Sequence, residues 1–401
     1  MTRRPSAHFP AGRGARPAHT RPGLHGDRDG SEDVAVRDVA HPRRRARPRE
    51  WLTTCTVGLA AIGGLGVAYA AAEAQWYVLR RLTVPMLAVG ATPLRVLHLS
   101  DLHLTLDHRG AHRADWVRRL AAEHPDLVVL TGDNFARAEA LPVLLDALAP
   151  FLTVPGAFVF GSNDYVSARW RNPARYLVSR LLGRDARDDR DRFTEEDFDL
   201  PWTDLRAALV RAGWFDLNNA RAKALVANHV IRMVGLDDPH IDRDCLPMRP
   251  AESQESGGKV DTPPLGRDMG GPADGSVAVG DGARDAIVLG VVHAPYRRAL
   301  DTLADDGARL ILAGHTHGGQ LALPGYGPLI ANCDVGTARA RGLHGWPGPR
   351  PDEPGGEKSV WLHVSAGLGT SPYVPLRIAA RPEATLLTLT GSDTDAERPV
   401  C

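Results

Sequence analysis

The chain has 401 residues, 43% of them hydrophobic, and its 48 basic and 48 acidic residues give a formal net charge of zero at pH 7. This composition is globular and allows one large or two ordinary domains. The first fifty residues hold twelve arginines against six acidic residues, so the remainder carries a net charge of −6. A nucleic-acid-binding domain would need a basic surface in its folded part, and we therefore expect no nucleic-acid partner.

The four cysteines, at positions 55, 245, 333 and 401, show no Cys-x-x-Cys spacing. This excludes a zinc ribbon and a disulfide framework. For Cys245 and Cys333, both a disulfide bridge and two free thiols are compatible with the sequence.

Residues 1–50 are rich in Arg, Pro, Gly, Ala and His and contain few large apolar side chains. Such a segment buries too little apolar surface to offset its chain entropy, so we expect a disordered basic tail.

Residues 51–74 are predicted to be a transmembrane anchor. No charged residue occurs in the 22 positions from Trp51 to Ala72, and a helix of that length spans the roughly 30 Å hydrocarbon core of a bilayer. The alternative is a cleaved signal sequence, because the residues at 72–74 form a small-x-small pattern. The length of the apolar run favours a retained anchor.

The distribution of arginine predicts the orientation of this anchor. Five arginines lie between positions 43 and 49, before the apolar run, and only Arg80 and Arg81 follow closely after it. Positively charged flanks stay on the cytoplasmic side. We therefore expect a single-pass protein of the cell membrane, with a cytoplasmic N-terminus and an extracytoplasmic domain.

Beyond the anchor, apolar runs and helical stripes alternate, which predicts an α/β domain over residues 93–392. A charged insertion is expected near 170–200 and a flexible Gly/Pro-rich loop near 249–284. The predicted helices are 111–123, 140–148 and 204–212, and the predicted strands are 94–99, 127–130, 157–160, 231–234, 287–292, 309–312, 359–364 and 384–389.

Polar residues of one chemical kind follow five of these strands. The side chains that can bind a metal are two carboxylates, one amide and four imidazoles: Asp101, His103, Asp133, Asn163, His293, His315 and His317. Ligands of open α/β sheets bind beyond the carboxyl ends of the strands, so these segments can converge. Seven such groups suit two divalent ions better than one. Each residue alone has a structural explanation, such as a helix cap, but the joint pattern does not.

The ordered motifs Asp-x-His, Gly-Asp, Gly-x-Asn-Asp, His and Gly-His-Thr-His resemble the calcineurin-like metallophosphoesterase superfamily. The segments 97–103, 314–320 and 366–371, followed by 381–383, are similar to its membrane-associated, YkuE-like bacterial branch. The resemblance implies a four-layer α/β/β/α sandwich with two mixed sheets and a two-metal centre.

The family pattern implies the role of each ligand. It assigns Asp101, His103 and His317 to one ion, His293 and His315 to the other, and Asp133 to a bridge between them. Mixed carboxylate, amide and imidazole ligands admit Mn, Fe, Zn or Mg, so the identity of the metal stays open.

The third motif departs from the family pattern, which is Gly-Asn-His-Asp. Here the stretch is Gly161, Ser162, Asn163 and Asp164. Without a gap, Ser162 takes the ligand position and Asn163 that of the acid. With a shift of one residue, Asn163 is the ligand and Asp164 the proton donor. We favour the shift, because an amide oxygen is a better neutral ligand for a divalent ion than a hydroxyl.

The function implied is a membrane-anchored phosphoesterase that hydrolyses a phosphate ester or pyrophosphate by a metal-activated hydroxide. A phosphorylated small molecule or a lipid-linked phosphate is the expected substrate, and the catalytic residues are Asp133 and Asp164. The alternative is a non-catalytic scaffold that keeps the metals, motivated by the changed third motif. A nuclease is disfavoured by the acidic globular part.

Two further stretches have simpler explanations than a role at the site. Residues 237–240, Asp-Asp-Pro-His, follow a strand and can touch the site, but a turn with Asp as cap and Pro fixing the bend explains them better. His363 lies inside a predicted strand and is not expected to be a ligand.

Overall fold

The structure is a computed structural model that describes residues 48–167, 194–249, 286–323, 325–371 and 374–392, with only the backbone for 48–60. Most of the predicted tail, most of the charged insertion and almost all of the Gly/Pro-rich loop lie outside these residues. The chain divides into two units, Met1–Thr56 and Val57–Cys401, and the second contains both large sheets.

The first sheet joins strands from both ends of the chain. Its neighbours are parallel except for the antiparallel pair β14 and β2. In spatial order the strands are β1 (Val78–Leu87), β14 (Glu383–Gly391), β2 (Leu94–Leu99), β3 (Leu127–Leu130), β4 (Gly156–Phe158) and β5 (Phe215–Asp216).

The second sheet is also mixed, with antiparallel pairs at its two edges. In spatial order its strands are β12 (Gly342–Trp346), β13 (Val360–Val364), β9 (Leu310–Ala313), β8 (Ile287–Val292), β7 (His229–Leu236) and β6 (Arg221–Val226). A separate two-stranded ribbon pairs β10 (Ala322–Leu323) with β11 (Gly327–Pro328).

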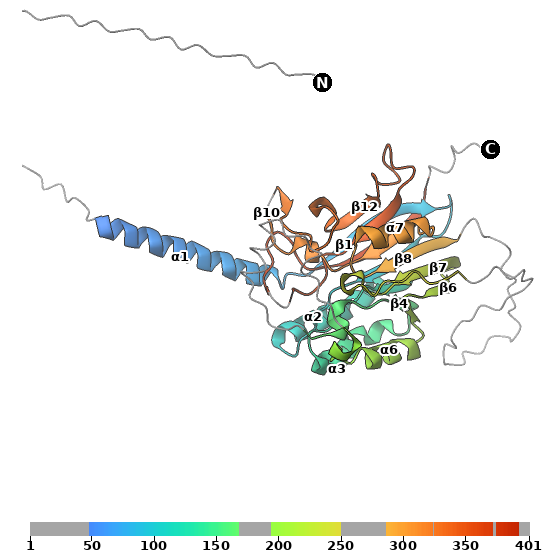
Figure 1. Ribbon diagram of the computed structural model, residues 1–401, viewed down its shortest axis with the longest axis horizontal. Coiled ribbons are helices and arrows are strands. Elements are labelled where there is room, and N and C mark those ends of the chain that lie inside the picture. The colour runs from blue at the N-terminus through green and yellow to red at the C-terminus, as the bar shows by residue number, and fades with distance from the viewer. Residues whose placement is uncertain (1–47, 168–193, 250–285, 324, 372–373, 393–401) are drawn as a thin grey trace, which may run out of the picture. The chain divides into compact units, whose positions relative to one another are not determined.

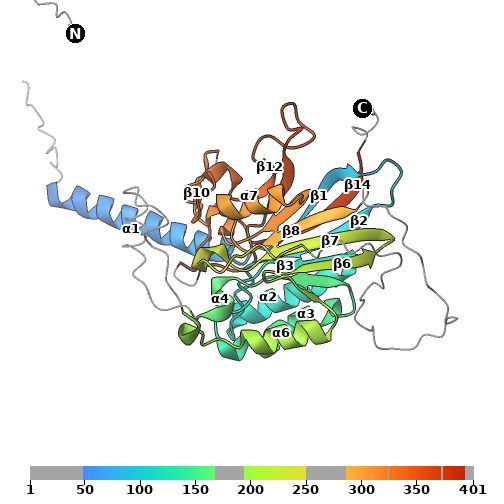
Figure 2. The same cartoon turned by 45° about the vertical axis from the view of Figure 1, so that its right-hand side comes forward.

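Helices cover the outer face of each sheet (Figures 1 and 2). Those on the first sheet are α2 (His108–Arg119), α3 (Leu141–Leu148) and α6 (Trp202–Arg211), and α7 (Arg297–Asp305) covers the second. The other α-helices are α1 (Pro48–Glu73) and the single turn α4 (Ser162–Tyr165). The start of α2 is capped by Asp107, whose carboxylate accepts a 3.0 Å hydrogen bond from the Gly110 amide. The short 3-10 helices are η1 (Leu120–Glu123), η2 (Ala138–Ala140), η3 (Ala149–Phe151), η4 (Glu195–Asp197), η5 (Pro239–Ile241), η6 (His317–Gly319) and η7 (Thr337–Arg339).

Alternation along the strands produces three stacked hydrophobic cores. In β3, Val128 and Leu130 pack with α2, α3 and α6, whereas Leu127 and Val129 pack against the second sheet. The far face of the second sheet packs on α7, where Leu300 and Leu303 share a core with Ile311. The order helices, sheet, sheet, helix is the predicted four-layer arrangement with two mixed sheets.

All eight predicted strands and all three predicted helices are present, with shifted ends. Among the strands and α-helices, the prediction missed β1, β5, β6, β10, β11, β12, α4 and α7. Because β1 pairs with β14 along its length, from Val78 opposite Glu383 to Leu87 opposite Gly391, the folded domain begins before residue 93, and the predicted boundary was wrong. The two adjacent arginines and the proline of β1 had hidden its strand character.

The predicted anchor falls on α1. No helix in the described part of the chain combines the length and the apolar character needed to cross a membrane. The C-terminal end of α1 is bound to the domain, since Ala70 O accepts a hydrogen bond from Arg377 N at 3.1 Å and Glu73 Oε1 accepts one from Ala380 N at 3.0 Å.

Candidate metal centre

The predicted ligands converge at the carboxyl ends of the strands in two buried groups of three. Within each group the ligand atoms lie within 4.8 Å of one another. The first group comes from the loops after β2 and β9, and the second from those after β3, β8 and β9. The first group is Asp101, His103 and His317, and the second is Asp133, His293 and His315.

Asp133 belongs to the second group and also faces the first. Its Oδ2 is 3.5 Å from His103 Nε2 of the first group and 3.5 Å from His293 Nε2 of the second. The loops after β2 and β3 are joined by backbone hydrogen bonds, from Asp101 N to Gly132 O and from His103 N to Asp133 O, both 2.9 Å. This pairing places one carboxylate where it can contact two ions.

The ligands do not lie on extended backbone. Positive φ angles occur at Asp101 (50°), His103 (39°), Asp133 (56°), His315 (69°) and His317 (50°). Each non-glycine residue in this region costs about 1 kcal/mol or more. His315 and His317 consequently point into different groups.

Glycines allow the loops to approach so closely. A Cβ on Gly314 would overlap Ser100 Oγ and lie 2.6 Å from Asp101 Oδ2. A Cβ on Gly161 would overlap Asp133 Oδ1 and lie 2.6 Å from His293 Nε2. The glycines therefore let backbone pass directly behind the metal-binding carboxylates.

The imidazole of His293 is oriented by a backbone carbonyl. Its Nδ1 lies 2.6 Å from Thr131 O, which can only accept, so Nδ1 carries the proton of this hydrogen bond. The other nitrogen, Nε2, lies 3.3 Å from His315 Nδ1 and faces Asp133. A metal-binding histidine is commonly held in this way by a carbonyl on its second nitrogen.

Charge is concentrated on Asp133 and His293. Although burial disfavours its charged form, the facing His293 and His103 hold the pKa of Asp133 well below its usual range. Burial also acts against charge on His293, but Asp133 and Asp238 hold the pKa of His293 well above its usual range. The site therefore attracts a positive charge next to Asp133.

The remaining imidazoles are neutral, as metal ligands must be. Burial lowers the pKa of His103 to about 4, against the attraction of Asp133. Burial likewise holds the pKa values of His315 and His317 well below their usual range.

The donor set fits a metal ion. Both ring nitrogens of His103 are buried and have no hydrogen-bond partner among the described residues. A buried polar group without a partner is costly, and a cation at Nε2 would satisfy it. Carboxylate oxygens and imidazole nitrogens around it suit divalent ions of borderline hardness.

Asn163 lies against the second group. Its backbone N donates to Asp133 Oδ1 and its Nδ2 donates to Asp133 Oδ2, both at 2.8 Å. The structure thus brings Asn163 to the carboxylate predicted to bridge the ions. Which residue of the third motif binds a metal stays a prediction.

Asp164, the predicted proton donor, is surrounded by hydrogen-bond donors of the protein. Both of its oxygens accept hydrogen bonds, from the backbone N of Asp133 and of Asn134 at 2.8 Å, from Gly161 N at 3.0 Å, and from the Asn134 amide. Burial and the nearby Asp133 raise the pKa of Asp164 to about 7. A carboxylate that accepts all these hydrogen bonds ties the loops together. Its assignment as the proton donor stays a prediction.

The stretch 237–240 is both a turn and a neighbour of the site. Asp238 caps η5 by accepting a 2.8 Å hydrogen bond from His240 N, as the turn prediction required. Burial raises the pKa of Asp238 to about 7, with His293 acting in the opposite direction. The His240 ring lies 4.5 Å from that of His315, centroid to centroid, and its Nδ1 lies 2.9 Å from Tyr296 Oη.

Two buried arginines hold the loops that carry the ligands, and sequence reasoning missed both. Arg113 Nη1 donates to Leu102 O at 2.6 Å and His103 O at 2.7 Å. Arg377 donates to several carbonyls, those of Ala366, Gly367, Gly369, Ala380 and His317. No local pattern marks these arginines, because their partners are backbone atoms of other segments.

His363 is buried on β13 and lies outside both groups, as predicted. Its Nδ1 is 2.9 Å from Nδ1 of His98, on β2 of the other sheet. Among the described cysteines, Cys245 is a free thiol and Cys333 Sγ lies 3.2 Å from Ala331 O.

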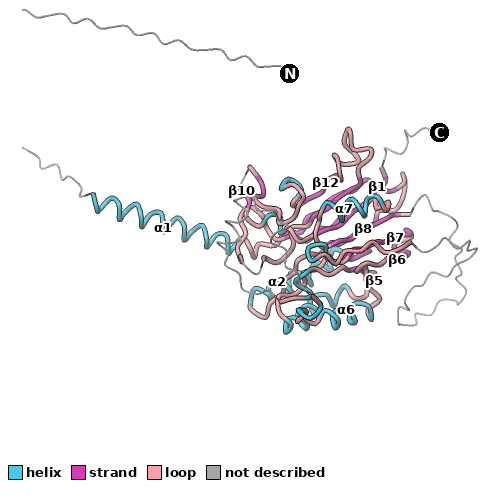
Figure 3. The backbone as a smooth tube through the Cα atoms, in the orientation of Figure 1, coloured by secondary structure: helices cyan, strands magenta, loops and turns pink. Residues whose placement is uncertain are grey.

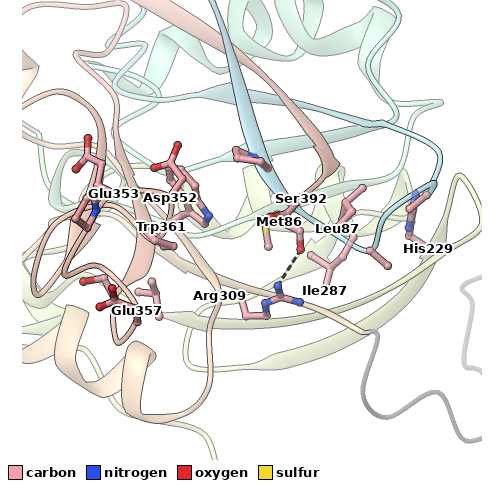
Figure 4. Close-up of a pocket in the computed structure, with 17 residues that line it drawn as sticks. Met86, Leu87, His229, Ile287, Arg309, Asp352, Glu353, Glu357, Trp361 and Ser392 are labelled. Atoms are coloured by element: carbon pink, nitrogen blue, oxygen red, sulfur yellow. Dashed lines mark hydrogen bonds between the residues drawn. The ribbon is translucent and has the colours of Figure 1, made fainter. Parts of the chain in front are cut away.

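A cavity of about 860 Å³ lies at the opposite ends of the strands (Figure 4). It is lined by Ile287 at the start of β8, Arg309 just before β9 and Val360 at the start of β13. Arg309 Nη2 donates to Met86 O at 2.9 Å. Since the metal ligands follow the carboxyl ends of the same strands, this cavity is separate from the metal centre.

Comparison with known proteins identifies the family. A family model described as calcineurin-like phosphoesterase matches residues 94–319, more than half of the chain. The chain is 39% identical over 99 residues to the uncharacterized metallophosphoesterase YkuE of Bacillus subtilis (strain 168), covering 25% of this chain and 29% of YkuE. It is 24% identical over 341 residues to the uncharacterized protein YpbG of the same strain, covering 82% of this chain and 97% of YpbG.

Two solved structures resemble the chain only distantly. The protein TT1561 of Thermus thermophilus has a TM-score of 0.29 at 11% identity, covering 69% of this chain and 91% of that protein. A dimetal phosphatase from Danio rerio has a TM-score of 0.33 at 13% identity, covering 75% of this chain and 93% of that protein.

The stretch matched by the family model contains every residue of both metal-binding groups. The chain therefore belongs to the calcineurin-like phosphoesterase family, and its two-sheet domain is a metallophosphoesterase domain.

Proposed function

We propose that this protein is a metal-dependent phosphoric ester hydrolase that holds two divalent ions side by side. The observation that carries the proposal is the position of Asp133, one of whose oxygens lies 3.5 Å from an imidazole of each group. Asp101, His103 and His317 would hold one ion. The other would be held by Asp133, His293 and His315, with Asn163 as a further ligand, and Asp133 would also face the first ion.

When bound, the two ions supply Lewis acidity and neutralise the charge that develops on the phosphoryl oxygens. The protein keeps His103, His315 and His317 neutral through burial, so that their nitrogens are free to bind metal. Asp133 stays ionised between the groups. Ser100 Oγ, at 2.5 Å, and His315 N, at 3.0 Å, hold the Asp101 carboxylate in place.

The proposed substrate is a phosphorylated small molecule or a lipid-linked phosphate or pyrophosphate. The support for a lipid-linked substrate is the uncharged run from Trp51 to Ala72, followed by the attachment of Glu73 to the domain. We place the N-terminus in the cytoplasm and the domain outside, as a single-pass protein of the cell membrane.

The test is hydrolysis of bis-p-nitrophenyl phosphate by the full chain, after chelation and readdition of Mn²⁺, Fe²⁺, Zn²⁺ or Mg²⁺ in turn. We expect turnover that disappears with the chelator and returns with at least one metal. Metal bound at two ions per chain without turnover would instead support a non-catalytic scaffold. One observation favours the non-catalytic scaffold: Asp164 accepts hydrogen bonds from four donor groups of the protein.

The bridging position is tested by Asp133→Asn. An amide removes the negative charge that both ions share, so we expect turnover to fall by more than about 100-fold while the far-UV circular dichroism stays unchanged. Asp204→Asn, at an exposed position in the first turn of α6, is the matched control. Full activity of Asp133→Asn contradicts the proposed centre.

A further inference from the structure

The segment that follows the metal ligand His317 has an unusual surface. No charged residue occurs from Gly318 to Cys333, and this stretch contains the ribbon β10–β11. Three of its large apolar side chains are exposed, Leu323 at 50%, Tyr326 at 79% and Leu329 at 45%. Water-soluble surfaces rarely leave large apolar side chains grouped without charge, and such groups mark binding sites.

Both ends of this ribbon are tied to the metal centre. On one side Gly319 lies two residues after His317, and a Cβ at Gly319 would overlap Pro328 of β11. On the other side Asn332 Nδ2 lies 3.2 Å from His315 Nε2. The chain between β9 and β12 is mostly loop here (Figure 3), and these two attachments keep the ribbon beside the metal centre.

The same ribbon lies beside the end of α1, as Figures 1 and 2 both show. Ala322 N donates to Ile378 O at 2.8 Å, and the adjacent Arg377 N donates to Ala70 O of α1 at 3.1 Å. One segment therefore holds the ribbon on one side and the helix on the other.

The described part of α1 also exposes large apolar side chains. Ile62 is 68% exposed, Leu65 72% and Tyr69 55%. Trp76, just after the helix, is 58% exposed, and the Arg381 guanidinium lies 4.9 Å from its ring centroid. Tyrosine and tryptophan with adjacent arginine are typical of the boundary between lipid headgroups and hydrocarbon.

We propose that β10–β11 and the exposed side chains of α1 form one lipid-docking surface, which places the metal centre at the headgroups of a bilayer. The sixteen uncharged residues favour lipid over a protein partner, whose interface would have a polar rim. The exposed side chains of α1 belong to the uncharged run of sequence that begins at Trp51, and this also favours lipid as the occupant. The proposal rests on the proposed function, because docking would bring a lipid phosphate to the two ions.

The experiment uses the full chain with its four native cysteines replaced by serine and an environment-sensitive NBD label on Leu323→Cys. The matched control carries the label on Leu225→Cys, an equally exposed position at 53% on β6. Both proteins are mixed with vesicles of phosphatidylcholine and phosphatidylglycerol, with and without a nitroxide-labelled lipid. We expect blue-shifted emission at position 323 that the nitroxide lipid quenches several-fold more strongly than at position 225.

Equal quenching at the two positions overturns the proposal. A blue shift at 323 that needs no vesicles and grows with protein concentration also overturns it, because the occupant is then a second copy of the chain. Hydrogen exchange of the unmodified full chain gives a second measurement. There, vesicles should protect the amides of β10 and β11 and leave those of β6 unchanged.

Hydrolysis of bis-p-nitrophenyl phosphate by the same samples separates this proposal from the proposed function. Turnover without lipid contact at position 323 excludes the docking surface and leaves the phosphoesterase intact. Lipid contact without turnover retains the surface and excludes the phosphoesterase.

Discussion

Five ligands of the metal centre have left-handed backbone conformations, and glycines next to them leave room for neighbouring loops. Conformations of this kind are stable only where surrounding contacts determine them. Here the contacts are the backbone hydrogen bonds between the loops after β2 and β3 and the carboxylate of Asp164, which binds backbone N–H groups on both sides of Asp133.

Gly161→Ala should remove metal from the second group. The added methyl group overlaps Asp133 Oδ1 and approaches His293 Nε2 to 2.6 Å, so two ligands must move. We expect the affinity of the protein for metal to fall by roughly 10–100-fold. Titration with Mn²⁺ measures it. Gly336→Ala is the control, because a Cβ there meets nothing within 4 Å. Equal affinity in the two variants would show that the loop behind Asp133 can relax.

The one-residue shift in the third motif predicts different effects for two neighbouring substitutions. Asn163→Ala should lower the metal content from two ions per chain toward one, because the amide lies against Asp133 at 2.8 Å. Ser162→Ala should leave it near two. Elemental analysis of the purified proteins measures both, and the reverse result would assign the ligand to Ser162.

At the scale of elements, the centre depends on segments that carry no ligand. Arg377 is fully buried, and its guanidinium binds carbonyl groups of the loops at 366–369 and at His317. Glycines in the same loop pack on the first group, since a Cβ on Gly369 would lie 2.7 Å from His103 Cβ. The segment 377–380 also binds the end of α1, so helix and metal loops are joined through one short stretch.

Arg377→Lys should destabilise the protein by about 2 kcal/mol, because an ammonium group cannot reach the carbonyls that the planar guanidinium spans. The measurement is urea unfolding of the metal-free protein. Arg232→Lys, at an exposed position of β7, is the control and should unfold like the wild type. Unchanged stability of Arg377→Lys would mean that water or a shifted loop replaces the guanidinium.

At the scale of the whole molecule, the two sheets are joined by a buried pair of histidines. His98 Nδ1 and His363 Nδ1 are 2.9 Å apart, and His98 Nε2 lies 2.9 Å from Thr131 Oγ1. Burial lowers the pKa of His98 to about 3 and that of His363 well below its usual range. Both imidazoles are therefore neutral in the folded state.

This pair should make the fold sensitive to acid. The unfolded chain binds protons at these histidines below about pH 6.5, and the folded state does not, so stability falls as the pH drops from 6.5 toward 3. Each histidine contributes a slope of up to about 1.4 kcal/mol per pH unit. Urea unfolding at pH 7 and pH 5 should show a smaller loss for His98→Leu/His363→Leu than for the wild type.

The control for this prediction is His108→Leu, an exposed histidine at the start of α2. It should keep the pH dependence of the wild type. If the double variant loses as much stability between pH 7 and pH 5 as the wild type, acid sensitivity resides in the ligand histidines instead.

The sequence by itself determined the chemistry of this protein. Apolar runs that each end in Asp, Asn or His were enough to predict the main strands and the residues that meet at the metal centre, because strand ends and ligand types are local properties. The two mixed sheets were implied by the resemblance to the family. The motifs also indicated the family.

The tertiary structure alone decided how those residues are held. The left-handed ligands, the structural role of Asp164 and the carbonyl partners of Arg377 depend on contacts between distant loops. The pairing of β1 with β14 also brings together the side chains of Arg80 and Glu383, which are 303 positions apart along the chain. Such contacts leave no local pattern, because their free energy arises only after the chain has brought the two segments together.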